Sequence, residues 1–189
     1  LYEIVDAVSA SRLEADIKTL VGFGTRHTLS DTLSSSRGIG AARRWIKSEF
    51  ETISKSCGNC LEVFYQKNYF TPKDGERIVK PVWINNVVAI QRGKTHPNRF
   101  VIMSGDIDSR ISDPTNYTDD SPGANDNASG MAGTLEAARV LSKYSFENSI
   151  IYVGLSGEEQ GLFGGKGLAA YAQEQGWEII GILNNDMIG

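Results

Sequence analysis

The sequence predicts a single α/β domain over residues 1–189, with three αβα layers and a mainly parallel mixed sheet. In the second half of the chain, short apolar segments alternate with longer amphipathic ones. This strand–helix–strand order is typical of parallel strands joined by right-handed crossovers and covered by helices on both faces. A chain of 189 residues is long enough to bury one core, and no repeat, low-complexity tail or linker divides it.

The first half predicts two helices followed by two strands. Apolar residues recur at helical spacing over Ile4–Leu20 and Gly38–Ile53. The pattern then changes to β-branched and aromatic residues over Leu61–Phe70 and Val82–Gln91. Pro72 and an Asp-Gly pair in Thr71–Arg77 mark a turn between these strands, so we expect them to pair antiparallel.

The second half predicts three strands and two helices in alternation. The strands are expected at Arg99–Met103, Ser149–Leu155 and Glu178–Leu183, and the helices at Ala128–Tyr144 and Gly161–Gln175. The last two strands are apolar enough to be buried on both faces of the sheet.

Composition excludes some classes of partner. The residues are 40% hydrophobic and 22% charged, as in an ordinary globular protein. No apolar run reaches the length of a membrane-spanning helix, so no membrane partner is expected. The net charge of −4 offers no basic excess to neutralise phosphates, which argues against nucleic acid. The oligomeric state stays open.

The two cysteines, Cys57 and Cys60, form a Cys-Gly-Asn-Cys motif. A redox-active pair normally opens a helix after a strand, whereas this pair follows a predicted helix and precedes a strand. A small local disulfide in an exported protein fits this context better, and two free thiols are the third alternative. We therefore expect an extracellular or periplasmic location.

Acidic residues follow the predicted strands, where sites collect in open parallel sheets. Carboxylates that converge on one edge repel one another unless cations compensate their charge, so the pattern favours a metal site. Each acid alone is typical of a solvated loop, and Asp126 also suits a helix N-cap. The four segments are Gly-Asp-Ile-Asp-Ser from Gly105, Gly-Ala-Asn-Asp-Asn from Gly123, Ser-Gly-Glu-Glu-Gln from Ser156 and Asn-Asn-Asp-Met from Asn184.

In this order, and with Gly-Leu-Phe-Gly following the third segment, the motifs resemble the M28 family of zinc peptidases. The resemblance runs from about Gly22, through Phe-Gly-Thr-Arg-His, to Gly189. It implies the zinc-exopeptidase (phosphorylase/hydrolase-like) fold, which bacterial aminopeptidases, glutamate carboxypeptidases and glutaminyl cyclases share. It also implies a peptide substrate and two zinc ions.

The resemblance assigns a role to each matching acid. Asp126 resembles the carboxylate that bridges two metal ions, and Glu159 and Asp186 resemble terminal ligands of one metal each. Glu158 resembles the general base that takes a proton from water and passes it to the leaving amine. Asp108 resembles the acid that orients a metal ligand. The implied catalytic residues are thus Glu158 and Asp108.

Asp106 departs from the family pattern, which has a histidine ligand at this position. A carboxylate also binds zinc, so we expect Asp106 to be a metal ligand. The added charge and harder donor predict easier acceptance of Mn²⁺, Mg²⁺ or Ca²⁺. The alternative is a degenerate, catalytically impaired homologue.

The family also supplies one further histidine ligand from a later loop. The histidines here, His27 and His96, are expected to be solvated loop residues and not ligands. This predicts an incomplete catalytic domain that lacks the C-terminal part with the last histidine. The expected function is a metal-dependent exopeptidase of the aminopeptidase type, and a glutaminyl cyclase-like acyltransferase is the alternative.

Overall fold

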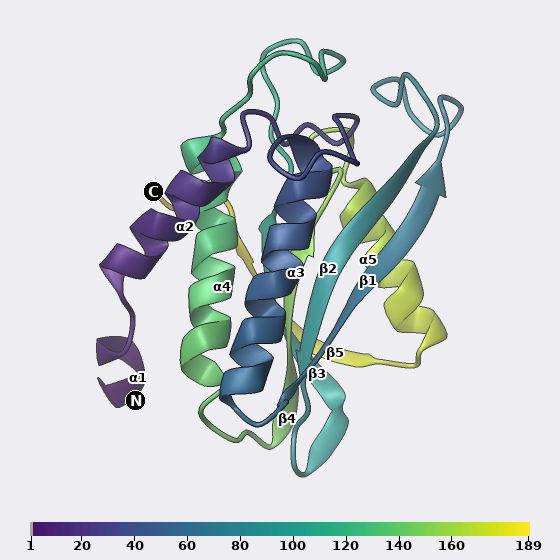
Figure 1. Ribbon diagram of the computed structural model, residues 1–189. Coiled ribbons are helices and arrows are strands. Elements are labelled where there is room, and N and C mark those ends of the chain that lie inside the picture. The colour runs from purple at the N-terminus through teal and green to yellow at the C-terminus, as the bar shows by residue number, and fades with distance from the viewer. Residues whose placement is uncertain (1) are drawn as a thin grey trace.

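The computed structural model describes residues 2–189, which form one five-stranded sheet with helices on both faces (Figure 1). The predicted α/β class is confirmed. The elements in chain order are α1 (Tyr2–Asp6), α2 (Ala10–Gly22), α3 (Gly38–Ser56), β1 (Leu61–Phe70), β2 (Val82–Gln91), β3 (His96–Asp106), the π-helical turn η1 (Ala124–Ser129), α4 (Gly130–Leu141), β4 (Asn148–Leu155), α5 (Phe163–Glu174) and β5 (Glu178–Asn185).

The sheet is mixed and has the strand order β1-β2-β4-β3-β5. β1 pairs antiparallel with β2, as the turn signals predict, and β2 pairs antiparallel with β4. β3 lies between β4 and β5 and is parallel to both. The parallel half of the sheet is therefore the half that carries the acidic motifs.

Two cores hold the three layers together. Helices α2, α3 and α4 cover one face, where Phe50, Ile46, Met131 and Tyr152 are fully buried. Helix α5 covers the other face, where Leu168 packs with apolar residues of β2, β3 and β4. Within residues 2–189, no helix combines the length and the apolar character needed to cross a membrane.

Two predictions about the ends of the fold were wrong. The expected helix Ile4–Leu20 is two helices, because the Ser9 side chain accepts a hydrogen bond from the Arg12 amide at 3.3 Å and begins a new helix there. The last strand is not buried: Ile182 and Leu183 are 62% and 57% exposed. Among the described residues, β5 lies at the edge of the sheet and pairs with β3 alone.

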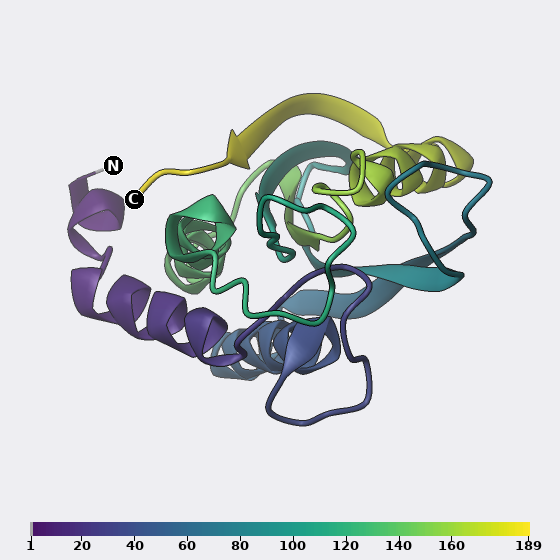
Figure 2. The same cartoon turned by 90° about the horizontal axis from the view of Figure 1, so that it is seen from above.

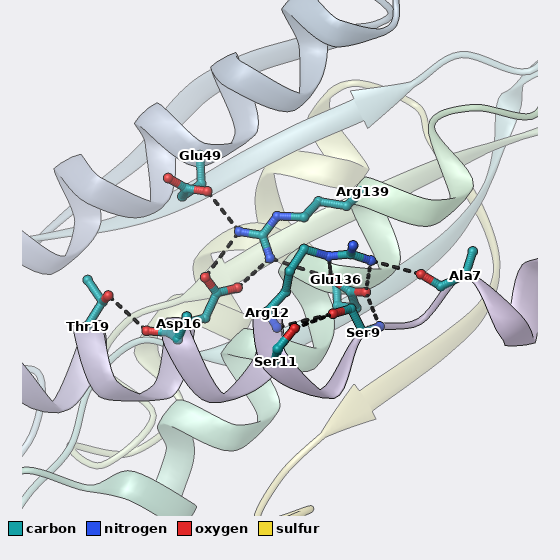
Figure 3. A network of polar contacts seen from close by, with 10 residues as sticks. Ala7, Ser9, Ser11, Arg12, Asp16, Thr19, Glu49, Glu136 and Arg139 are labelled. Atoms are coloured by element: carbon teal, nitrogen blue, oxygen red, sulfur yellow. Dashed lines mark hydrogen bonds and ion pairs between the residues drawn. The ribbon is translucent and has the colours of Figure 1, made fainter.

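An interhelix ion network joins α2, α3 and α4 (Figure 3). Arg139 on α4 bonds Asp16 on α2, and its Nη2 donates to Glu49 Oε2 on α3 at 2.8 Å. Glu136, one turn earlier on α4, accepts from Arg12 Nε at 2.8 Å. We use the term interhelix ion network for these five residues. In it, every carboxylate has an arginine partner.

Candidate metal centre

Three parallel strands end at one edge of the sheet and bring the acidic motifs together. Asp106, the last residue of β3, lies opposite Leu155 at the end of β4, and Gly105 lies opposite Asn185 at the end of β5. Figure 2 views the molecule from above and shows loops spread across this edge between α4 and α5. We call the six acids carried here the strand-end acid cluster: Asp106, Asp108, Asp126, Glu158, Glu159 and Asp186.

Three of these acids, Asp106, Glu158 and Asp186, line one cavity of about 430 Å³. They come from the ends of three different strands, as the sequence predicts. The cation in the lining, Lys166, donates to the Gly161 carbonyl at 2.9 Å. Its ammonium group is therefore hydrogen-bonded to the backbone just before α5.

Burial and mutual repulsion disfavour the ionised forms of two acids of the cluster. Burial and then the neighbouring Asp108 raise the pKa of Asp106 to about 8. Burial, followed by Asp108 and Glu159, raises the pKa of Glu158 to about 7. Asp186 adds to both shifts, and Asp126 adds to that of Glu158. Like charges that raise one another's pKa in this way favour a bound cation.

Asp108 fastens the Glu158 segment to the end of β3. It is 1% exposed, and its Oδ1 accepts from the Glu158 amide at 3.2 Å. Its Oδ2 accepts from the Glu159 amide at 3.2 Å and from the Thr28 hydroxyl at 2.8 Å. Burial nevertheless raises the pKa of this carboxyl. Asp108 thus orients the backbone that carries Glu158.

The predicted ligand Glu159 has a different partner in the structure. Its Oε2 accepts from Arg110 Nε at 2.5 Å, and burial still raises the pKa of the carboxyl. Accordingly, in the part of the chain that the structure describes, no three acidic, histidine or cysteine side chains are close enough to hold one ion. The geometry brings the predicted acids to one edge without assembling a ready ligand set.

The donor chemistry of the cluster nevertheless suits a divalent cation. Asp106 and Asp186 present carboxylate oxygens to one cavity, and oxygen donors bind Zn²⁺ as well as Mg²⁺, Mn²⁺ and Ca²⁺. Glu159 does not line this cavity, and its carboxylate is paired with Arg110. Asp126 lies in η1, at the start of the turn that leads into α4.

Asn127 is a site residue that sequence reasoning missed. It is 1% exposed, and its Nδ2 donates to Asp106 Oδ2 at 3.0 Å and to the Asn185 carbonyl at 2.9 Å. Its Oδ1 accepts from the amides of Gly130 and Met187 at 3.1 and 3.2 Å. One side chain thus joins β3, β5 and the start of α4. Its place beside Asp126 in the second motif was the available signal.

Arg26 is the second residue that sequence reasoning missed. It is 1% exposed, and its guanidinium donates to four backbone carbonyls. Two acceptors, Ile107 and Gly123, belong to the first and second acidic motifs and lie 2.8 and 2.9 Å from the guanidinium nitrogens. The others are Leu20 and Pro122. Burial lowers the pKa of Arg26 to about 10, and the nearby Asp108 and Asp126 oppose that shift.

His27 is not the solvated residue that the sequence suggests. Its ring is fully buried, and Nε2 lies 3.0 Å from the Pro114 carbonyl. Burial lowers its pKa. His96 is the exposed first residue of β3 and lies at the opposite end of that strand from Asp106. Neither histidine belongs to the strand-end acid cluster.

Sequence comparison matches the part of the chain that carries the acids. The model of peptidase family M28 matches residues 86–189. A probable zinc metalloprotease of Pyrenophora teres f. teres is 45% identical over all 189 residues, and one of Pyricularia oryzae is 42% identical. The chain covers 39% and 37% of these relatives, so it spans about two fifths of their length.

Solved structures share the fold at low identity. LapB of Legionella pneumophila superimposes with a TM-score of 0.76 at 20% identity, over 100% of this chain and 46% of LapB. A glutaminyl cyclase of Porphyromonas gingivalis gives a TM-score of 0.73 at 20% identity, over 96% and 62% of the two chains. The fold, the acids at the sheet edge and the match to the family model agree: the chain belongs to peptidase family M28.

Proposed function

We propose that this chain forms part of a zinc-dependent exopeptidase of the aminopeptidase type. The observation that carries the proposal is the convergence of Asp106, Glu158 and Asp186 on one cavity at the ends of parallel strands. Family membership and relatives named as probable zinc metalloproteases support a peptide substrate and zinc.

In the proposed reaction, Glu158 is the general base. Zinc ions, when bound, would lower the pKa of water and polarise the scissile carbonyl. Glu158 would accept the proton of the attacking water and donate it to the leaving amine. A pKa near 7 suits both transfers, because the group then gains and loses a proton with little free-energy cost at neutral pH. Asp108 would keep Glu158 in place through its amide.

Replacing Glu158 tests this role in the full-length protein. Glu158→Gln is expected to lower kcat for Leu-p-nitroanilide by about 10²–10⁴-fold, because the amide cannot accept the proton. Glu174→Gln, on the exposed surface of α5, is the matched control and should leave kcat unchanged. An unchanged rate in Glu158→Gln would remove the proposed mechanism.

We propose two zinc ions, held by Asp106, Asp126, Glu159 and Asp186. Asp106 in place of histidine hardens the donor set, so Mn²⁺, Mg²⁺ and Ca²⁺ should compete with zinc more readily. Elemental analysis of protein purified without added metal measures this preference, with Asp106→His as the comparison. Stoichiometric zinc that excess Mn²⁺ displaces from neither protein would contradict the role assigned to Asp106.

A glutaminyl cyclase reaction is the alternative on this fold. The fold alone does not separate the two activities, since structures of both kinds superimpose on the chain. Leu-p-nitroanilide and a peptide with N-terminal glutamine distinguish them. Release of p-nitroaniline without cyclisation of the glutamine is the expected result.

We also propose that the protein is exported, to an extracellular or periplasmic compartment. The Cys57–Cys60 disulfide, which the structure contains, supports this proposal because such bonds persist in oxidising compartments. Immunodetection in culture medium, periplasm and cell extract tests it. Detection in the cytosol alone would contradict it.

A further inference from the structure

A second, larger cavity of about 1060 Å³ lies away from the acidic one, beside the β1–β2 hairpin. Its walls are the loop that precedes α3, the start of α3, and the hairpin. Figure 1 shows that the hairpin rises at the same end of the molecule as the loops of the sheet edge. Asn85 lines the cavity, and its carbonyl accepts from the Ser156 hydroxyl at 3.0 Å, two residues before Glu158. One lining residue of the cavity is therefore hydrogen-bonded to the segment that carries the proposed base.

The lining of this cavity is cationic although the chain as a whole has a net charge of −4. It contains Arg37, Arg43, Lys67 and Lys80, against Asp31 as its carboxylate. Asp31 is already engaged, because its Oδ1 accepts from two amides of its own loop at 2.6 and 3.0 Å. We call the lining with these four cations the basic cavity.

Three of the four cations, Arg43, Lys67 and Lys80, have no carboxylate partner among the described residues. Arg37 pairs with Asp120 at 2.6 Å, and the Lys80 ammonium lies 3.7 Å from the Tyr117 ring centroid. The Lys67 ammonium is farther from a ring, 6.0 Å from the Tyr65 centroid, and the Arg43 guanidinium has no ion-pair partner within residues 2–189. Arg43 and Lys67 are thus available to an anion.

Partial burial of Arg43 destabilises its charge, so a bound anion would lower the free energy of this site. The Arg43 guanidinium is half-buried, and this burial lowers its pKa because a cation is costly to remove from water. A half-buried charge without a counter-ion costs free energy that a bound anion can recover.

The basic cavity also presents aromatic rings. Tyr69 and Trp83 lie opposite each other on β1 and β2, with ring centroids 5.2 Å apart. They are 52% and 56% exposed, and both line the cavity. A ligand that suits this lining has carboxylates for the cations and apolar groups for the rings. A peptide with acidic side chains has both.

We propose that the basic cavity binds the acidic side chains of a peptide whose scissile bond lies at the strand-end acid cluster. The inference rests on the proposed peptidase function and names its substrate class: peptides with Asp or Glu several residues from the cleaved bond. Four cations are too few for a nucleic-acid surface on a chain of net charge −4.

Direct binding tests the proposal without requiring turnover. Fluorescence anisotropy of the full-length protein is measured with a fluorescein-labelled Leu-Ala-Gly-Glu-Glu-Glu peptide and with its Gln-Gln-Gln counterpart. The acidic peptide is expected to bind about tenfold more tightly or better, and added salt should reduce the difference. The double variant Arg43→Gln/Lys67→Gln should lose this preference. Lys94→Gln/Lys143→Gln removes the same charge beside a different cavity and should keep it.

Hydrolysis of the same peptides then separates this inference from the proposed function. If the enzyme cleaves both peptides, the double variant should raise KM for the acidic one and leave kcat/KM for Leu-p-nitroanilide unchanged. Equal affinity for both peptides in the unmodified protein would overturn the inference, whether or not the protein is a peptidase. Competition by inorganic phosphate or duplex DNA at the peptide's own concentration would overturn the choice of a peptide. Tighter binding of the acidic peptide without hydrolysis of either peptide would contradict the peptidase function and leave the proposed binding site standing.

Discussion

The interhelix ion network and the strand-end acid cluster both bury carboxylates, but arginines pair with those of the network, whereas other acids surround those of the cluster. Burial raises the pKa of Asp16 even within the network. In the network, burial favours neutral Glu136, but hydrogen bonds from Arg12 and the Ser9 amide hold its pKa below the ordinary value. In the cluster, burial and neighbouring acids raise the pKa of Asp106 to about 8. The network is complete within residues 2–189, whereas the cluster has an excess of charge that a cation would balance.

The comparison shows how a structural acid differs from an acid kept for chemistry. A paired carboxylate contributes to folding stability. It adds little to the free energy of ligand binding, because its charge is already balanced by an arginine. A carboxylate among like charges costs stability, and ligand binding recovers that cost. Replacing a buried arginine in each region tests this comparison most directly. Arg26 bonds the loops of the strand-end acid cluster, and Arg139 belongs to the interhelix ion network.

Replacement of Arg26 should have the largest effect. Arg26→Met removes a donor from four backbone carbonyls, and those of Ile107 and Pro122 accept from no other backbone amide among the described residues, so we expect a loss of about 3–5 kcal/mol in the free energy of unfolding. Arg44→Met is the matched control: Arg44 also donates to loop carbonyls but is exposed, and should cost less than about 1 kcal/mol. Urea denaturation measures both, and equal losses would contradict the role of Arg26.

Replacement of Arg139 should be nearly as costly. Arg139→Met leaves Asp16 and Glu49 without their partner between α2 and α3, and we expect a loss of about 3 kcal/mol. Zinc affinity, measured by equilibrium dialysis, should not change, because the network lies apart from the strand-end acids. A weaker affinity for zinc would show that the two regions are coupled.

The pH dependence of stability should reveal the charge excess of the cluster. The pKa of Asp106 is raised from 3.8 to about 8 in the folded chain, so its proton stabilises the fold below pH 3.8. That contribution is lost as the pH rises through about 8. In EDTA, stability should therefore fall by about 1–2 kcal/mol from pH 5 to pH 8, since solvent screens part of the effect.

Asp106→Asn should flatten this pH profile, because the amide does not titrate. Asp6→Asn, at an exposed position on α1, serves as the control and should keep the slope. Thermal unfolding at several pH values measures the three proteins. A profile that rises toward pH 8 in EDTA would contradict the sign of the Asp106 shift.

The smallest effect should come from an exposed pair beside the network. Lys18 donates to Glu14 at 2.6 Å one turn apart on α2, but both side chains are about two-thirds exposed or more. Lys18→Met should leave the urea midpoint unchanged within error, because solvent screens such pairs. A clear loss would show that proximity to the network, and not burial, sets the value of an ion pair here.

The sequence predicts most of the fold because local patterns determine it. Strands Leu61–Phe70 and Val82–Gln91 have the bounds that the β-branched and aromatic residues predict. The first helix was predicted too long because Val5 and Val8 continue the helical spacing across the Ser9 cap. Exposure of Ile182 was not predicted, since strand order, which local apolar character does not contain, puts β5 at the edge.

The site was predicted only in part, because some of its contacts join residues that are far apart in the sequence. Parallel strands bring their carboxyl ends together, so the gathering of Asp106, Glu158 and Asp186 follows from strand order. The pairing of Glu159 with Arg110 does not, because it depends on side-chain rotamers across a loop. Arg26 acts through carbonyls from distant segments, and such acceptors leave no signature in residue types.

Two glycines set how closely α4 approaches the strands. A methyl group on Gly105 would lie 2.6 Å from the Gly130 backbone, and one on Gly130 would lie 2.1 Å from the Asn185 carbonyl oxygen. Where β3, β5 and the start of α4 meet, the distance between them is therefore set by main-chain atoms in contact, and main-chain atoms have the same size in every protein. The distance between two main-chain segments in contact does not depend on the size of the surrounding side chains. This gives a physical reason why folds only one-fifth identical in sequence superimpose on this one.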